Sequence, residues 1–470
     1  MKKSSLTIFA LLFLFSVNLA AGPSSWPCFH PNYGQTNLVV QEHPVLCWQV
    51  ALGDSVQVYN TTSPIVGWIG QEEVVYLGTS QGLYCLAADS GTIICSRPTA
   101  QSIQYAPAYA DTNRLYVPSG DSLLCFNPTN GQRLWGYQCS DKVFHVVNLG
   151  NDVGVIDASA NVYVFSSANY QLRWHAGPLS SGGCDNTSLI MDNERCVYAV
   201  TLGNPLSYFD FAFYKLGLDS GNVIWSDQEL FWEPAGIRLT PGLRPNNQLC
   251  FATCRAEFWG SSIYNFDASN HQMTWRRSFT YPDGAIYASP AIDVNGYTYF
   301  PLATGLVGLD DSNQQRWRYN FLINASSPVV NGDHKIIFGT ADGYLTILDH
   351  GGAVLESDSC GGDLTSPAIG GDGSIYIANS LGTVYKYDDE VVGQKEEWSP
   401  VAQINALKIY PNPFVDRLTI ATRAFVTIYA MDGRLVFRGQ APLTWPTSQL
   451  PEGLYLVKLD GRQGIKLVKD

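Results

Sequence analysis

The sequence predicts an all-β protein, an eight-bladed β-propeller followed by a small immunoglobulin-like β-sandwich. A repeated strand–turn–strand pattern and a regular series of tryptophans predict the propeller. The sandwich is predicted because residues 407–470 leave the repeat and consist of short alternating strands. Charge supports this division, because residues 407–470 carry +4, from nine Lys/Arg and five Asp/Glu, whereas residues 22–406 carry −19. We therefore divide the chain into a leader at 1–22, a propeller at 23–391, a linker at 392–406 and a terminal domain at 407–470.

Residues 1–22 are predicted to be a cleavable signal peptide. Lys2 and Lys3 precede an apolar run from Leu6 to Val17, which ends on small residues near Gly22. The run is too short for a membrane anchor, which needs about 20 apolar residues, and no later segment is apolar enough. We expect export and no transmembrane segment in the mature chain.

The repeat has a constant pattern of strands and turns. Val74 to Gly91 reads VVYLGTSQGLYCLAADSG, and Lys335 to Gly351 reads KIIFGTADGYLTILDHG. Each is an alternating strand, a tight turn, a second alternating strand and a Gly turn, followed by a short closing strand. The closing strands are marked, 38 to 51 residues apart, by Trp48, Cys95, Trp135, Trp174, Trp225, Trp275, Trp317 and Leu355.

A second series of markers opens the units and gives the same count of eight. Near His145 and Thr187 the proline is lost and spacing alone marks the unit. The last unit stops at Asp388 without a closing strand, so the strand around Trp48 is predicted to complete the eighth blade. The opening markers are Ser63-Pro64, Ala106-Pro107, Thr240-Pro241, Ser289-Pro290, Ser327-Pro328 and Ser366-Pro367.

Charge and cysteine content narrow the function. An acidic propeller repels phosphate backbones, which argues against a nucleic-acid partner. Eleven cysteines are compatible with an oxidising compartment, where close pairs form hairpin disulfides; the alternative is that they are small buried core residues. No Cys-x-x-Cys or His-x-x-x-His spacing occurs, so no metal site is predicted. The close pairs are Cys85 with Cys95, Cys125 with Cys139, Cys184 with Cys196, and Cys250 with Cys254.

The Tyr-x-Gly-Thr, Asp-Gly-x-Leu, Leu-Asp-x-x-x-Gly and terminal Trp pattern resembles the pyrroloquinoline-quinone-like propeller repeat, over about residues 24–390. One branch of that superfamily contains quinone-dependent alcohol dehydrogenases, which hold the cofactor on the propeller axis with calcium, a catalytic Asp and often two adjacent disulfide-bonded cysteines. This chain has no adjacent cysteine pair, and Asp310-Asp311 and Asp388-Asp389 occupy turn positions where Asp caps its own backbone. No catalytic triad or phosphate-binding loop is visible.

The other branch is non-catalytic, like the outer-membrane assembly lipoprotein, and acts as an interaction platform. This chain resembles it in size and blade number, but has no lipid anchor and carries a further domain. We therefore predict a secreted or cell-surface non-catalytic scaffold for a protein or carbohydrate partner, with no catalytic residues and no cofactor. The alternative is a quinone-dependent oxidoreductase acting on alcohols or sugars.

Blades four and five have enlarged, aromatic loops that are predicted to bind the partner. Loops between second and third strands emerge on the same face as blade-to-blade connections, so these aromatics should cluster, and they would give a large contact area. The alternative is that they pack on one another to hold the long loops. The residues are Tyr208, Phe209, Phe211, Phe231, Trp232, Phe258 and Trp259.

Residues 407–470 resemble the type IX secretion sorting domain of Bacteroidetes-like bacteria. The resemblance implies export through the periplasm and across the outer membrane by the type IX machinery, followed by release or surface attachment. The rival interpretation is a fibronectin-like adhesion module. The matching positions are Tyr410, Pro411, Asn412, Pro413, Asp432, Gly433, Arg434, Gly453, Tyr455, Lys466 and Lys469.

Overall fold

The computed structural model separates into two compact units, residues 1–388 and 389–470, which are described individually. The signal peptide and the predicted linker lie outside the described residues. Across the described residues, no helix has the length and hydropathy needed to span a membrane. The structure describes residues 26–29, 31–36, 38, 40, 43–58, 62–192, 194–202, 211–227, 239–253, 261–270, 272–280, 283, 286, 288–321, 326–388, 409–410, 415–420, 425–430, 435–440, 443–451, 453–459 and 462–469.

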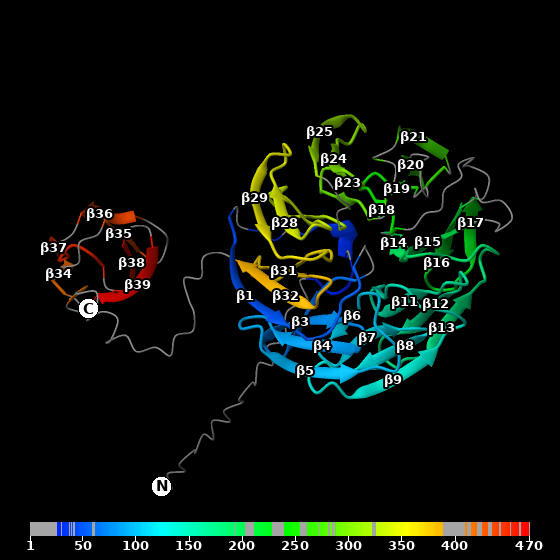
Figure 1. The fold of residues 1–470 in the computed structure, drawn as a ribbon, viewed down its shortest axis with the longest axis horizontal. Coiled ribbons are helices and arrows are strands. Elements are labelled where there is room, and N and C mark those ends of the chain that lie inside the picture. Colours follow the sequence, from blue (N-terminus) through cyan, green and yellow to red (C-terminus); the bar gives the residue numbers. More distant parts are fainter. Residues whose placement is uncertain are drawn as a thin grey trace, which may run out of the picture. The chain divides into compact units, whose positions relative to one another are not determined.

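The first unit is an eight-bladed propeller, as predicted, with eight antiparallel four-stranded sheets around one axis (Figure 1). From the axis outward, blade one is β2 (Ile65–Ile69), β3 (Glu72–Gly78), β4 (Gly82–Ala87) and β5 (Ile93–Pro98); blade two is β6 (Ala108–Asp111), β7 (Arg114–Ser119), β8 (Ser122–Phe126) and β9 (Arg133–Gln138); blade three is β10 (Val147–Asn148), β11 (Asp152–Ile156), β12 (Val162–Ser166) and β13 (Leu172–Ala176); blade four is β14 (Ile190–Met191), β15 (Cys196–Leu202), β16 (Phe211–Gly217) and β17 (Val223–Asp227).

Blade five is β18 (Gly242–Leu243), β19 (Gln248–Ala252), β20 (Ser261–Asp267) and β21 (Gln272–Phe279); blade six is β22 (Ala291–Ile292), β23 (Thr298–Leu302), β24 (Gly305–Leu309) and β25 (Gln315–Asn320); blade seven is β26 (Val329–Val330), β27 (Ile336–Gly339), β28 (Tyr344–Leu348) and β29 (Val354–Ser359); blade eight is β30 (Ala368–Ile369), β31 (Ile375–Ala378), β32 (Thr383–Asp388) and β1 (Val45–Ala51). The middle strands are buried on both faces by neighbouring blades, which explains runs such as VVYLG in β3, whereas the outer strands alternate between exposed and partly buried residues.

The ring is closed, as predicted, by an N-terminal strand that completes the last blade of the propeller. β1 pairs antiparallel with β32, from Val45 opposite Asp388 to Ala51 opposite Thr383. The first strand of the chain thereby becomes the outer strand of the last blade. Hydrogen bonding across this junction makes the eight blades one continuous ring.

Every outer strand carries a register shift at the same place, next to the tryptophan position. A bulge of this kind bends and twists the exposed edge, which discourages pairing with another chain. The marker predicted at Leu355 is wrong by one residue, because Glu356 is the residue opposite Ile347 and Leu355 is the bulged residue itself. The sequence pattern alone did not show where the extra residue lies.

Tryptophans of the outer strands dock several blades onto the next blade. The indole N–H of Trp48 donates to the carbonyl of Ala88 at 3.1 Å, and that of Trp317 to the carbonyl of His350 at 2.7 Å. Both carbonyls belong to the turn of the following blade that contains the repeat glycine. At Gly91 an added Cβ would lie 2.8 Å from the Trp48 ring, so the docking contact requires glycine.

The serine-proline markers form a chain of buried hydrogen bonds between blades. The amide of Thr240 donates to Ser289 Oγ at 2.9 Å, Ser289 to Ser327 Oγ at 2.9 Å, and Ser327 to Ser366 Oγ at 3.1 Å. Proline holds the preceding residue in extended conformation, which is the backbone state that such a chain needs. The marker is therefore a connection between consecutive blades from five to eight.

The strand register separates the candidate disulfides. Cys85 lies directly opposite Cys95, whereas Cys125 lies opposite Trp135. A hydrogen bond from the Cys85 thiol lowers the pKa of Cys95 to about 7; burial opposes this shift, and the charge of Arg97 reinforces it. Within the described residues, the first pair alone among the predicted ones faces across a ladder.

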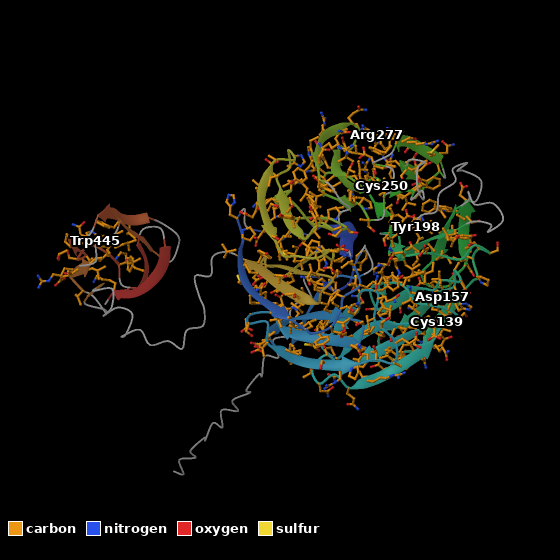
Figure 2. The ribbon with its side chains drawn as sticks, in the orientation of Figure 1. Cys139, Asp157, Tyr198, Cys250, Arg277 and Trp445 are labelled. Carbon is orange, nitrogen blue, oxygen red and sulfur yellow. The ribbon has the colours of Figure 1, made fainter. Side chains whose placement is uncertain are left out.

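The second unit consists of two antiparallel sheets that share one apolar cluster. Leu418 and Ile420 of one sheet pack with Val426 and Ile428 of the other, and Trp445 borders the cluster (Figure 2). This arrangement is the layered β-domain that the sequence predicts; its immunoglobulin-like topology stays a prediction. The sheets are β33 (Ile409–Tyr410), β34 (Arg417–Ile420) and β37 (Leu443–Pro446), and β36 (Leu435–Gln440), β35 (Phe425–Ala430), β38 (Gly453–Leu459) and β39 (Arg462–Lys469).

Candidate axial binding site

The segment before β1 crosses the propeller axis. The carbonyl of Trp26 accepts from Val66 in blade one at 2.8 Å, and the amide of Thr36 donates to Val330 in blade seven at 3.0 Å. Between these points the short helix η1 (Pro31–Gly34) contacts β22 of blade six. Figure 1 shows this blue segment in the middle of the ring.

Aromatic side chains of this segment fill part of the axis. Trp26 and Phe29 are 1% and 3% exposed, and the Phe29 ring stacks on His145 with 4.0 Å between centroids. His145 occupies the place of the lost proline marker between blades two and three, and Tyr105 packs edge-on against it at 5.1 Å. The chain therefore supplies its own axial plug, which also explains why this blade departs from the Ser-Pro pattern.

Beside the plug is a cavity of about 710 Å³. The N-terminal segment forms one wall, and the inner strands and first turns of blades three to six form the others; Figure 2 labels Tyr198 and Cys250 in two of these blades. Glu194 and Val294 are exposed at its rim. The remaining lining combines polar residues with an aliphatic part formed by Val147, Leu149, Leu189, Ile190, Leu243 and Ile292.

Two polar atoms of the cavity wall have no partner in the structure. Asn148 donates from Nδ2 to the carbonyl of Tyr109 at 2.9 Å, which leaves its buried Oδ1 unbonded. Thr240 Oγ1 is also buried without a partner. An unpaired buried polar atom costs about 1–3 kcal/mol.

Asp192 in the cavity wall is held by hydrogen bonds and by an ion pair. Asp192 accepts the amides of Glu194 and Cys196 at one oxygen, and its other oxygen accepts the Tyr198 hydroxyl at 2.9 Å and lies 3.2 Å from the Lys215 ammonium. Burial lowers the Lys215 pKa, but hydrogen bonds to Tyr198 and Asp192 outweigh it and raise the pKa above its ordinary value. These contacts make Asp192 a turn-capping residue.

Asp293 is held by hydrogen bonds in the same way in blade six, two blades after Asp192. Its Oδ1 accepts the amides of Asn295 and Tyr297, and its Oδ2 lies 3.0 Å from His334 Nδ1. The cavity's arginine, Arg244, is 2% exposed and donates into the junction of blades five and six. Little formal charge is therefore free to meet a ligand at the described wall.

These residues do not fit the calcium-bound quinone that one branch of the resemblance implies. The stacked pair of Phe29 and His145 occupies space beside the cavity, and both oxygens of the Asp192 carboxylate already accept hydrogen bonds. Glu194, the remaining acid of the cavity lining, points to the rim and pairs with Lys215 at 3.3 Å.

The predicted aromatic contact residues lie mostly outside the described residues: Tyr208, Phe209, Phe231, Trp232, Phe258 and Trp259. The backbone of Phe211 opens β16 opposite Leu202, and its side chain is outside the description. The neighbouring Phe213 is buried core, packed 4.6 Å from Phe251 between ring centroids. The aromatic surface stays a prediction.

The predicted sorting positions are partly described. Tyr410 pairs with Thr419, and the buried Tyr455 donates its hydroxyl to the carbonyl of Pro451 at 2.7 Å. Both terminal lysines lie in β39, Lys466 opposite Leu456 and Lys469 opposite Gly453. Pro411, Asn412, Pro413, Asp432, Gly433 and Arg434 lie outside the described residues.

Sequence reasoning missed the polar wall of the cavity and the grouping of Asp293, His334 and His350. Thr240 belongs to the Thr240-Pro241 marker that opens blade five, and this marker was the only sequence feature that pointed to the residue. Asn148 lies in β10 of blade three, and the two histidines lie in separate turns of blade seven, so both features depend on how the blades pack.

Comparison with known families agrees with this architecture. Residues 45–236 match the family model of the outer membrane protein assembly factor BamB, and residues 408–470 match that of the secretion system C-terminal sorting domain. No curated protein matches the chain.

Three solved structures share the propeller. A europium-containing methanol dehydrogenase superposes with a TM-score of 0.63 at 13% identity, covering 78% of this chain and 98% of that one. BamB from Moraxella catarrhalis gives 0.57 at 14%, covering 73% and 99%. The quinohemoprotein alcohol dehydrogenase from Comamonas testosteroni gives 0.62 at 14%, covering 83% and 85%. At such identities the likeness shows the fold alone.

The blades, their docking tryptophans and these matches define a β-propeller of pyrroloquinoline-quinone-like repeats. The chain is such a repeat protein, and it ends in a type IX secretion sorting domain. The sorting domain implies export and interaction with the secretion machinery.

Proposed function

We propose that the propeller is a non-catalytic binding scaffold, secreted or displayed on the cell surface, and that its axial cavity receives part of a protein or carbohydrate partner. The observation that carries this proposal is the cavity of about 710 Å³ itself, whose wall combines aliphatic side chains with polar ones such as Gln35, Ser188 and Asn247. Apolar surface with a few convergent polar groups is the usual lining of a binding site.

The axial plug supports a scaffold over an oxidoreductase. Phe29 and His145 fill space beside the cavity, and the Asp192 carboxylate is committed to its own turn. Purified protein supplied with quinone, calcium and alcohol or sugar substrates is expected to reduce no electron-acceptor dye. Dye reduction, or a quinone absorbance band in the protein as isolated, would overturn the proposal.

The binding test uses an exposed residue at the rim. Val294 is 55% exposed, so Val294→Lys places a charge at the cavity mouth with little effect on folding. Affinity for surface glycans and outer-membrane proteins of the producing bacterium, measured on arrays and by pull-down, should fall at least about tenfold. Leu381→Lys, at an aliphatic residue 72% exposed in blade eight, is the matched control and should bind like the natural protein. Equal binding by all three proteins contradicts a role for the cavity.

The aromatic loops have a separate test. Trp232→Ala together with Trp259→Ala is expected to weaken binding while the unfolding temperature stays near that of the natural protein. Lower stability with unchanged binding would show that these rings only hold their loops.

Export is tested by removing the sorting domain. Deleting residues 407–470 should leave a folded propeller in the periplasm, detected by fractionation and antibody, because the matched domain spans residues 408–470. Appearance of the truncated protein in the medium or on the surface would contradict the proposed route.

A further inference from the structure

We propose that Asp293, His334 and His350 bind one divalent transition-metal ion of the zinc class at the junction of blades six and seven. Asp293 follows β22, His334 lies in the turn between β26 and β27, and His350 lies in the turn after β28. One donor atom from each lies within 4.8 Å of the other two. Two imidazoles and one carboxylate form a donor set that zinc commonly accepts.

The distances are close to those of a metal site. Asp293 Oδ2 lies 3.0 Å from His334 Nδ1, and the Tyr299 hydroxyl lies 3.1 Å from His350 Nδ1 and 3.2 Å from Asp293 Oδ2. Bonds of about 2.0–2.2 Å in tetrahedral geometry separate ligand atoms by about 3.3–3.6 Å. The donor atoms, within 4.8 Å of one another, must therefore move closer together to form the site.

Neighbouring groups hold the ligands in place. The backbone amides of Asn295 and Tyr297 fix the Asp293 carboxylate at 2.9 Å each. The Tyr299 hydroxyl donates to the same carboxylate at 3.2 Å. The indole N–H of Trp317 donates to the backbone carbonyl of His350 and so holds that backbone in place. Supporting hydrogen bonds of this kind orient metal ligands in known sites.

His334 occupies a position that disfavours an ordinary side chain. Its φ is +60°, and the corresponding turns of blades four, five, six and eight place Arg195, Asn247, Gly296 and Gly373 there with φ of +62°, +65°, +83° and +89°. Histidine pays about 1 kcal/mol for this conformation relative to glycine. A strained residue at a cluster of donor atoms is consistent with a functional role.

The ion would keep one position open to solvent. The Asp293 and His334 side chains are 2% and 30% exposed, whereas His350 is exposed and lines a surface cavity of about 380 Å³ that also includes Lys335 and Asp349. Three protein ligands leave the fourth position of a tetrahedral ion for water or for a donor from a partner.

The test is metal titration of the exported protein, purified without a histidine tag and stripped with a chelator. Calorimetry with zinc chloride, and visible absorption with cobalt chloride, should show one equivalent bound with a micromolar or tighter Kd. His334→Asn keeps a residue that accepts positive φ, and His350→Ala removes a second ligand. Each variant should weaken binding at least about tenfold.

Two controls separate this site from other donors. His43→Ala changes an exposed histidine that pairs with Glu356 at 3.2 Å, and Cys196→Ser alters the other described donor group, Asp192 with Glu194. Both should bind zinc like the natural protein. Failure of the natural protein to bind zinc, unchanged binding in both ligand variants, or loss of binding in Cys196→Ser instead would overturn the proposal.

A measurement on the natural protein avoids any folding defect of variants. Zinc should protect His334 and His350 from diethyl pyrocarbonate, followed by mass spectrometry, while His43 remains reactive. Equal modification of all three residues with and without zinc would show an ordinary hydrogen-bonded cluster and no metal site.

Discussion

Gly91 offers a quantitative test of how blades dock. In Gly91→Ala the new Cβ lies 2.8 Å from two atoms of the Trp48 ring, at a φ of +69°. The left-handed backbone costs an alanine about 1 kcal/mol, and overpacking adds about 1–3 kcal/mol. We therefore expect the free energy of unfolding to fall by about 2–4 kcal/mol.

Gly150→Ala is the matched control, because its φ is +77° and no heavy atom lies within 4 Å of the added Cβ. It should lose only the backbone cost of about 1 kcal/mol. Urea unfolding of the exported protein, followed by tryptophan fluorescence and combined with Trp48→Ala in a double-mutant cycle, measures the difference. Equal losses at both glycines, or no coupling between Gly91 and Trp48, would refute the docking explanation.

Two further predictions follow from charged and thiol groups. Asp283→Asn should lower stability at pH 7 by about 1 kcal/mol, because the Arg318 guanidinium holds Asp283 through two bonds of 2.6 Å at a partly exposed site where solvent screens the pair. Hydrogen bonding to Arg318 lowers the pKa of Asp283 below its ordinary value of 3.8. The stabilisation by this pair is therefore complete above pH 3.8 and is lost as the pH falls through the lower pKa of the folded state. Equal acid unfolding of the variant and the natural protein would contradict this prediction. In the reduced protein, iodoacetamide should alkylate Cys95 at a much lower pH than Cys47, because the pKa of Cys95 is about 7. Burial, and after it the charge of Asp388, raises the pKa of Cys47 above 9.0. Mass spectrometry across pH checks this order, and simultaneous labelling would show that the shared hydrogen bond of Cys95 has no effect.

The number of blades was predictable because each blade repeats the same pattern of strands and turns. A middle strand needs apolar residues on both faces, a docking tryptophan needs glycine in the next turn, and both needs appear in sequence as a period. The off-by-one marker at Leu355 shows the limit. A bulge inserts a residue without changing the composition of the strand, so its position is set by the ladder with β28.

The axial site was not predictable in the same way. Its wall combines Asn148, Thr240 and the N-terminal Phe29, which are distant in sequence and belong to no repeated pattern. The grouping of His334 with His350 likewise arises because two turns of blade seven meet the turn after β22. A zinc motif read from spacing requires ligands in one local unit, and this cluster is built across blades.

The N-terminal segment has two roles that deletion can separate. Val45–Ala51 closes the ring by pairing with β32, whereas residues 26–40 cross the axis and form a wall of the cavity. Removing residues 26–40 loses the buried rings of Trp26 and Phe29, a cost of about 3–5 kcal/mol for each, but should leave eight paired blades. Removing Val45–Ala51 should leave β32 as an unpaired edge, so that limited proteolysis attacks blade eight first and the chain self-associates. If removing residues 26–40 exposes blade eight to protease as fast as removing Val45–Ala51 does, the axial segment also contributes to ring closure, and the N-terminal segment does not have two separate roles.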